Sequence, residues 1–206
     1  MYYFSRKLSS LHFTEILMLM RTSLSAVIFF TIILLSCRTS KPTSGTMTMA
    51  DQAPGNPAPV NYSEPSTWLL GYIDPVQFLK TPHSEWFEKG YDLYQPDQEI
   101  LKKLLQRGNE NLSIKIVLGT WCPDSRREVP RFQKILDLCN FPKDVVTYIG
   151  VDNTKIAPVG EYDKLGIERV PTFIFMINKI EAGRIIENPV ASLEQDMLNI
   201  LTRNDK

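Results

Sequence analysis

Apolar residues after position 96 recur with two periods, which predict alternating strands and helices. Residues 113–118 alternate along the chain and put their isoleucines on one face, as a strand does. A helical period starts after Asp97, a good N-cap residue, and stops at Gly108, a good C-cap residue. Its apolar positions are Ile100, Leu101, Leu104 and Leu105. The chain therefore places a helix directly before a strand.

The same periods continue to the C-terminus. They predict helices at 125–138 and 158–165 and a final helix that Ser192 and Gln195 begin as a capping box. They predict strands at 145–151, 172–177 and 182–186, with a turn at 178–179 between the last two. This order is typical of an α/β fold in which helices flank a central mixed sheet.

The N-terminal part differs from the rest. An apolar run at 24–35 follows Arg21 and is shorter than the roughly 20 residues that a membrane span needs, so it is typical of a signal peptide. Leu34-Leu35-Ser36-Cys37 resembles the lipobox of bacterial lipoproteins. That resemblance implies removal of residues 1–36, a lipid on Cys37 and attachment to a bacterial membrane. The alternative is an uncleaved signal anchor with an incidental cysteine.

Three further segments follow this signal. Residues 37–66 are rich in Pro, Ser, Thr, Gly and Asn, which predicts a flexible tether. Residues 67–96 mix strand and turn signals and are predicted to be an N-terminal extension of the domain. We interpret their aromatic-rich stretch as packing: Trp86, Phe87, Tyr91 and Tyr94. Residues 97–206 carry the periodic pattern and form the predicted domain.

Composition excludes several classes of protein. The formal net charge is 0, so nothing favours a nucleic-acid partner. His12 and His83 have no partners at metal-ligand spacing, and there is no Gly-rich phosphate loop, so we expect no metal and no cofactor. The three cysteines, Cys37, Cys122 and Cys139, are too few for a disulfide-stabilised scaffold.

The candidate chemistry lies in Trp121-Cys122-Pro123-Asp124-Ser125, between a predicted strand and a predicted helix. The N–H groups and partial positive charge of a helix N-terminus favour a thiolate over a thiol. Arg126 and Arg127 strengthen this effect if they point towards the sulfur, and otherwise are solvated surface charges. Two-cysteine redox motifs carry a second thiol three residues on, where this chain has Ser125.

This motif belongs to a wider pattern that resembles the thioredoxin-like family. Pro130 stands eight residues after Cys122, and Val170-Pro171-Thr172 matches the family's cis-proline motif. The resemblance covers residues 97–203 and implies a thioredoxin-like fold with Pro171 opposite the sulfur. It implies three catalytic residues, Cys122, Ser125 and Pro171. It also implies four residues that bind the substrate: Trp121, Pro123, Val170 and Thr172.

Two departures from the family remove parts of one reaction step, the attack by a second, buried thiol. The buried aspartate usual six residues before the cysteine is Ile116 here, and the second thiol is Ser125, whose hydroxyl can instead donate to the thiolate. Cys139 is 17 residues from Cys122 along one predicted helix, about 25 Å away. A disulfide needs Cα atoms within about 7 Å, so we interpret Cys139 as a buried apolar side chain.

The predicted function is therefore monothiol thiol–disulfide exchange on exported proteins, in the periplasm or at the cell surface. Cys122 would attack a client disulfide, and a client thiol, a small external thiol or a reductant protein would release it. One alternative is a non-catalytic peptide-binding or assembly module. Another, peroxide sensing through Cys122, is disfavoured because Gly119 stands where peroxide-reducing relatives carry threonine.

The lipoprotein hypothesis predicts a specific label. A bacterial host fed radioactive palmitate should label the wild-type chain, and Cys37→Ala should remove the label because it removes the acceptor thiol. Gel autoradiography checks this, with Cys139→Ala as the matched control that keeps the label. A label that survives in Cys37→Ala would contradict the hypothesis.

Overall fold

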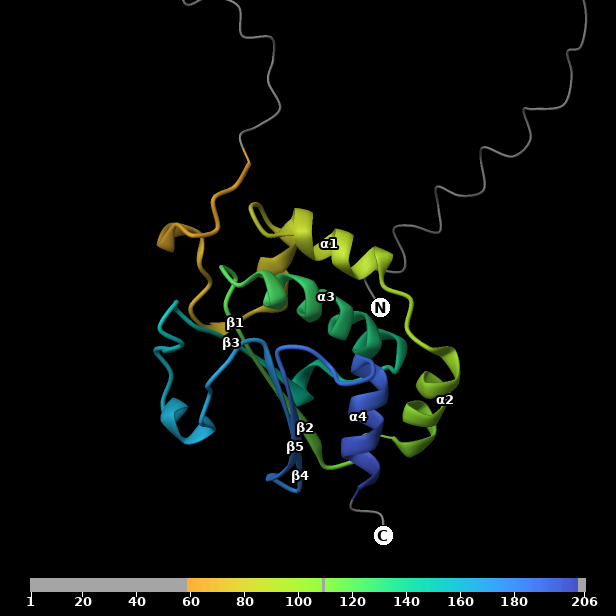
Figure 1. Ribbon diagram of the computed structural model, residues 1–206. Helices are drawn as coiled ribbons and strands as arrows, with labels where there is room; N and C mark the ends of the chain where they lie inside the picture. Colours follow the sequence, from red (N-terminus) through yellow and green to blue (C-terminus); the bar gives the residue numbers. More distant parts are fainter. Residues whose placement is uncertain (1–58, 109, 204–206) are drawn as a thin grey trace, which may run out of the picture. The chain divides into compact units, whose positions relative to one another are not determined.

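The computed structural model describes residues 59–108 and 110–203. The predicted signal segment, Cys37 and the tether up to residue 58 lie outside the described residues. Within them the chain forms helices α1 to α4 and strands β1 to β5 (Figure 1). None of these helices has the length and apolarity that crossing a membrane would require.

The strands form one mixed sheet in the order β1-β3-β2-β4-β5. β2 (Leu112–Leu118) runs parallel to β3 (Val146–Gly150) and antiparallel to β4 (Thr172–Ile177). The edge strands, β1 (Gly71–Ile73) and β5 (Ile180–Ile186), both pair antiparallel with their neighbours. The predicted α/β class with a mixed sheet is confirmed.

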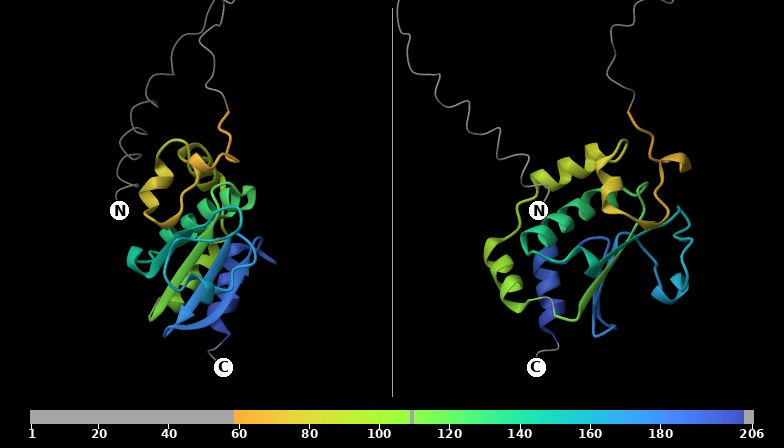
Figure 2. Two further views of the ribbon diagram at one scale, coloured as in Figure 1. Left: turned by 90° about the vertical axis from the view of Figure 1, so that its left-hand side faces the viewer. Right: turned by 180° about the vertical axis from the view of Figure 1, so that it is seen from behind.

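All four helices lie on one side of this sheet, as the two views of Figure 2 agree. They are α1 (Ser84–Leu93), α2 (Gln98–Arg107), α3 (Pro123–Leu138) and α4 (Leu193–Thr202). The sheet is therefore flanked by helices on one face in the described residues, and the sequence pattern did not indicate which face each helix covers. The opposite face is covered by residues 151–171, whose predicted helix 158–165 is only a 3-10 turn, Tyr162–Leu165.

Helix α3 packs across the middle of the sheet and forms the centre of the core. Phe132 of α3 is fully buried, and its ring centroid lies 4.6 Å from that of Phe173 on β4. Ile116 of β2 belongs to the same buried cluster and fills the position where an aspartate was expected by resemblance. Burial of such side chains contributes about 1.5–3 kcal/mol each, so this contact fixes α3 on the sheet.

The N-terminal part of the fold contains a helix that the sequence pattern left unassigned. Helix α1 places Phe87 in the core, where it stacks on Phe78 at 5.1 Å. Gly90, three residues further along, allows close packing against α3, since a Cβ there would lie 2.6 Å from Cγ of Pro130. Helix α1 was missed because glycine and aromatic residues are weak helix formers, and packing on α3 supplies the stability.

The folded structure also begins earlier than the predicted boundary at residue 67. Tyr62 donates its hydroxyl hydrogen to the Pro82 carbonyl at 2.6 Å, and Trp68 Nε1 donates to the Tyr62 carbonyl at 2.9 Å. A 3-10 turn, Pro65–Thr67, lies between these contacts. The predicted tether 37–66 is therefore too long, because its last residues are attached to the domain.

The contact of this segment with the sheet gives a stability prediction. Gly150→Ala would place a Cβ 2.0 Å from the Leu69 carbonyl oxygen, a backbone atom that no rotamer change can move. We expect a loss of about 2–3 kcal/mol in the free energy of unfolding, measured by urea denaturation. Gly160→Ala, where nothing lies within 4 Å, is the control and should stay within about 0.5 kcal/mol of wild type. Equal stability of the two variants would contradict the close contact.

Candidate functional site

Cys122 lies at one end of the central strands of the sheet. β2 and β3 end there and β4 begins there, and the Val151 N–H donates to the Leu118 carbonyl just after β3. Cys122 is the N-cap residue of α3 with extended backbone, φ −80° and ψ 123°, and Pro123 follows as the first helical residue. Carboxyl ends of parallel strands and helix N-termini are common positions for functional groups.

The sulfur of Cys122 contacts the cis-proline segment. Its thiol donates a hydrogen bond to the Val170 carbonyl, with Sγ 3.3 Å from the oxygen. The Val170–Pro171 peptide is cis, as the sequence motif implied. The structure therefore brings Cys122, Val170 and Pro171 together, although 48 residues separate the bonded pair.

The Cys122 side chain is only 7% exposed. It shares an apolar cluster with Val117, Val151 and Val170 on the face that the loop 151–171 covers. Pro123, which follows it, is exposed.

Ser125 supports the loop before Cys122. Its side chain is fully buried, and Oγ accepts a hydrogen bond from the Gly119 N–H at 3.2 Å. The predicted hydrogen bond from this hydroxyl to the sulfur does not occur among the contacts of the described residues. Ser125 instead holds the backbone between β2 and α3, because Oγ satisfies an N–H that would otherwise be buried without a partner.

The Trp121 side chain packs against the apolar cluster that contains Cys122. Its Nε1 donates to the Val151 carbonyl at 3.0 Å, and its ring is tilted against Trp68 with centroids 6.4 Å apart. The ring folds back over Gly119, where a Cβ would lie 2.5 Å from the indole. Trp121 is thus held by backbone contacts on both sides and has a defined position next to Cys122.

The two arginines after the motif are held by backbone carbonyls and acidic side chains. Arg126 Nη1 donates to the Thr120 and Trp121 carbonyls, each at 2.9 Å, and its guanidinium carbon lies 4.4 Å from the centroid of the Tyr62 ring. The charge of Arg126 is therefore used to hold the loop, and the contacts in the structure do not direct it at the sulfur.

Arg127 is paired with acidic side chains. It forms ion pairs with Asp124 at 2.7 Å and with Glu128 at 2.6 Å, and the hydrogen bond to Glu128 raises the pKa of its guanidinium. Glu128 is itself buried and also contacts Arg131. The positive charge expected near the thiol is therefore balanced locally.

Two residues of the site carry no sequence signal. Thr120 is fully buried, and its Oγ1 accepts a hydrogen bond from the Leu69 N–H at 3.2 Å. Tyr62 covers Arg126 from a segment that was predicted to be tether. Both contacts join parts of the chain more than 50 residues apart, so no local pattern could reveal them.

The cis-proline segment is fixed by its own hydrogen bonds. Thr172 Oγ1 donates to the Arg169 carbonyl at 2.6 Å, and the Glu187 N–H donates to the Pro171 carbonyl at 2.7 Å. Val170 and Thr172 are almost fully buried. The carbonyl that the thiol contacts is therefore part of a rigid support.

Cys139 lies at the opposite end of α3, as its C-cap residue. It is 8% exposed and belongs to the main apolar core, in agreement with the interpretation from the sequence. Burial raises the pKa of the Cys139 thiol to about 11, which keeps it protonated. In the part of the chain that the structure describes, no three His, Cys, Asp or Glu side chains gather as a metal site would need.

Comparisons with known proteins add little. No family model and no curated protein matches the chain. A solved structure of a protein of unknown function, PA1234 from Pseudomonas aeruginosa, is 16% identical with a TM-score of 0.40, over 58% of this chain and 79% of that one. An HIV epitope scaffold is 17% identical with a TM-score of 0.36, over 57% and 71%. Similarity this weak carries no argument, so the site is interpreted from its own geometry.

The two described thiols should differ in reactivity. At pH 8 a thiol with a pKa of about 11 is only about one part in a thousand thiolate, so iodoacetamide should leave Cys139 unmodified in the native protein. Cys122, at the N-terminus of α3, should be modified first because a helix N-terminus favours the thiolate, and both should react in guanidinium. Peptide mapping by mass spectrometry measures this. Modification of native Cys139 at the rate of Cys122 would contradict the raised pKa of Cys139.

Proposed function

We propose that residues 97–206, with residues 67–96 as an N-terminal extension, form a thioredoxin-like domain that exchanges disulfides with exported client proteins through Cys122. The observation that carries this proposal is the Cys122 thiol at the start of α3, 3.3 Å from the carbonyl that precedes a cis-proline. The mixed sheet and the placement of α3 are consistent with that fold.

The proposed reaction has two balanced steps. The Cys122 thiolate attacks one sulfur of a client disulfide, a new Cys122–client disulfide forms, and the other client sulfur leaves as a thiolate. A second thiolate then attacks the client sulfur of this mixed disulfide and releases Cys122 as a thiolate. If the second thiolate belongs to the client the result is isomerisation, and if external thiols complete the reaction the client is reduced.

Client binding can be coupled to ionisation of Cys122. The hydrogen bond to Val170 exists only while Sγ holds its proton, so ionisation leaves that carbonyl oxygen without this donor. A backbone N–H of an extended client chain can replace it, as in strand addition. Trp121 and Pro123 border the sulfur and would contact the same client, while Pro171 and Thr172 keep the support rigid.

The thiol that releases Cys122 must come from outside the described fold. Ser125 occupies the position of a second thiol, and Cys139 is buried at the far end of α3 with its pKa at about 11. A small thiol, a reductant protein or a client cysteine can all supply it. The lipid proposed for Cys37 would hold this chemistry at a bacterial membrane, in the periplasm or at the cell surface.

A second candidate function is a peptide-binding or assembly module that does not use the thiol. The 7% exposure of Cys122 and its hydrogen bond to Val170 favour this candidate, because a reactive sulfur needs an approach path. In that case the surface beside Val170 would bind an extended segment, and Cys122 would act only as a small apolar side chain.

Trapping of mixed disulfides separates the two functions. Full-length wild type, Cys122→Ala and Cys139→Ala are expressed in a bacterial host, quenched with acid and isolated under non-reducing conditions. Exchange predicts adducts that dithiothreitol releases, present in wild type and Cys139→Ala and lost in Cys122→Ala. Adducts equal in all three chains, or none in any, would favour the binding module.

A further inference from the structure

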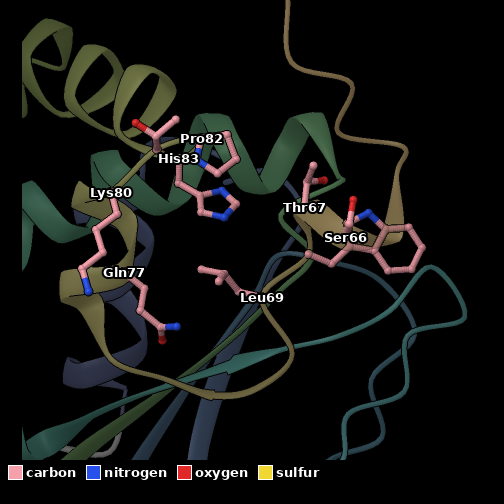
Figure 3. Close-up of a pocket in the computed structure, with 9 residues that line it drawn as sticks. Ser66, Thr67, Leu69, Gln77, Lys80, Pro82 and His83 are labelled. Carbon is pink, nitrogen blue, oxygen red and sulfur yellow. The ribbon is translucent and has the colours of Figure 1, made fainter.

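A cavity of about 260 Å³ is lined in part by residues 66–69, the segment whose Leu69 N–H donates to Thr120 in the loop before Cys122. Figure 3 shows residues from two stretches facing it, one around Thr67 and Leu69 and one from Gln77 to His83. This volume exceeds what a single water molecule needs and approaches the size of small-molecule sites. The cavity belongs to no part of the proposed exchange reaction.

His83 is the polar side chain that sets the chemistry of this cavity. It is only 3% exposed, it precedes α1, and its imidazole points into the space beside Leu69 in Figure 3. Its Nδ1 is buried without any hydrogen-bond partner among the described residues. A buried polar group of this kind is uncommon in a folded protein and calls for a physical reason.

The surroundings of His83 determine which nitrogen carries the proton. Burial, together with the positive charge of Arg126, lowers the pKa of the imidazole and keeps it neutral near pH 7. Rings of Tyr62 and Trp86 pack 6.3 and 6.0 Å from it. A bare lone pair is less costly than an N–H where no partner exists, so Nδ1 is the unprotonated nitrogen. Nε2 then carries the hydrogen and can donate it to an occupant.

The charges around the cavity favour a negative occupant. Lys80 is a lining residue, and Figure 3 places its ammonium group beside Gln77. No acidic side chain lines the cavity, and the charge of Arg126 also reaches His83. Leu69 and Pro82 supply apolar surface for a short carbon stem. The cavity thus combines one N–H donor, one cation and an apolar wall.

We propose that this cavity binds a carboxylate carried by a short apolar stem, with His83 Nε2 donating to a carboxylate oxygen and Lys80 supplying the opposite charge. A small organic acid and the C-terminus of a peptide both present this group. Charge-assisted hydrogen bonds are stronger than neutral ones, so the carboxylate is preferred over an amide of the same shape.

Binding is measured on the full-length chain by tryptophan fluorescence and calorimetry, because Trp68 lines the cavity and Trp86 contacts His83. The probes are sodium butyrate and its neutral counterpart butyramide, and N-acetyl-Ala-Ala and its C-terminal amide. We expect saturable binding of at least one acid and at least about tenfold weaker binding of its amide. The acid that binds more tightly identifies a free acid or a peptide terminus as the source.

Variants test the two groups named. His83→Phe should weaken acid binding at least about tenfold, and His83→Gln, which keeps a neutral N–H donor, should restore most of it. Lys80→Met, at an exposed position, should also weaken binding and tests the proposal if His83→Phe does not fold by circular dichroism. Lys164→Met, an exposed lysine outside the lining, is the control and should bind as wild type does.

Three outcomes would overturn the proposal. They are no saturable binding of either acid to the wild-type chain, equal binding of acid and amide, and unchanged binding by folded His83→Phe and Lys80→Met. The first would mean that water alone fills the cavity. Because the assay does not involve Cys122, its result is independent of the trapping experiment.

Discussion

The packing of α3 against the central strands is the contact on which the rest of the site depends. Phe132 lies against Phe173 at 4.6 Å, and Ile116 completes the same buried cluster. This contact fixes the direction of α3, and so fixes its first residue, Cys122, at the edge where β2 ends and β4 begins. The position of the sulfur therefore follows from aromatic and aliphatic burial several residues away from it.

Polar contacts then complete the position of the loop. Ser125 binds the Gly119 N–H, Arg126 binds two carbonyls, and Thr120 receives the Leu69 N–H. Each of these groups is buried or half-buried, so the loss of one partner would leave the other unsatisfied. The residues around a single thiol thus keep the backbone in place without any direct contact between Ser125 and the sulfur.

Local sequence signals predicted the elements that have a clear period and clear ends. Strand β2, helix α3 and the turn at 178–179 were predicted, and the Asp97 and Ser192 caps bind the N–H groups expected of them. The cis-proline came from a motif. Helix α1, the helices gathered on one face and the roles of Tyr62, Thr120 and Arg126 were missed, because they depend on contacts between segments far apart in the chain. The exchange chemistry at Cys122 was inferred from residue types. The fold shows where these residues lie and does not test that chemistry.

The attachment of the N-terminal segment has a mechanical consequence. The described chain starts at residue 59 and reaches β1 only after Tyr62 has bonded to Pro82 and Leu69 to Thr120. A pulling force applied before residue 59 would load these bonds before it reached the hydrogen bonds between β1 and β3. Their rupture would free Thr120, two residues from Cys122, while the sheet stayed intact. Tension on this end of the chain would therefore loosen the thiol loop first and unfold the protein only later.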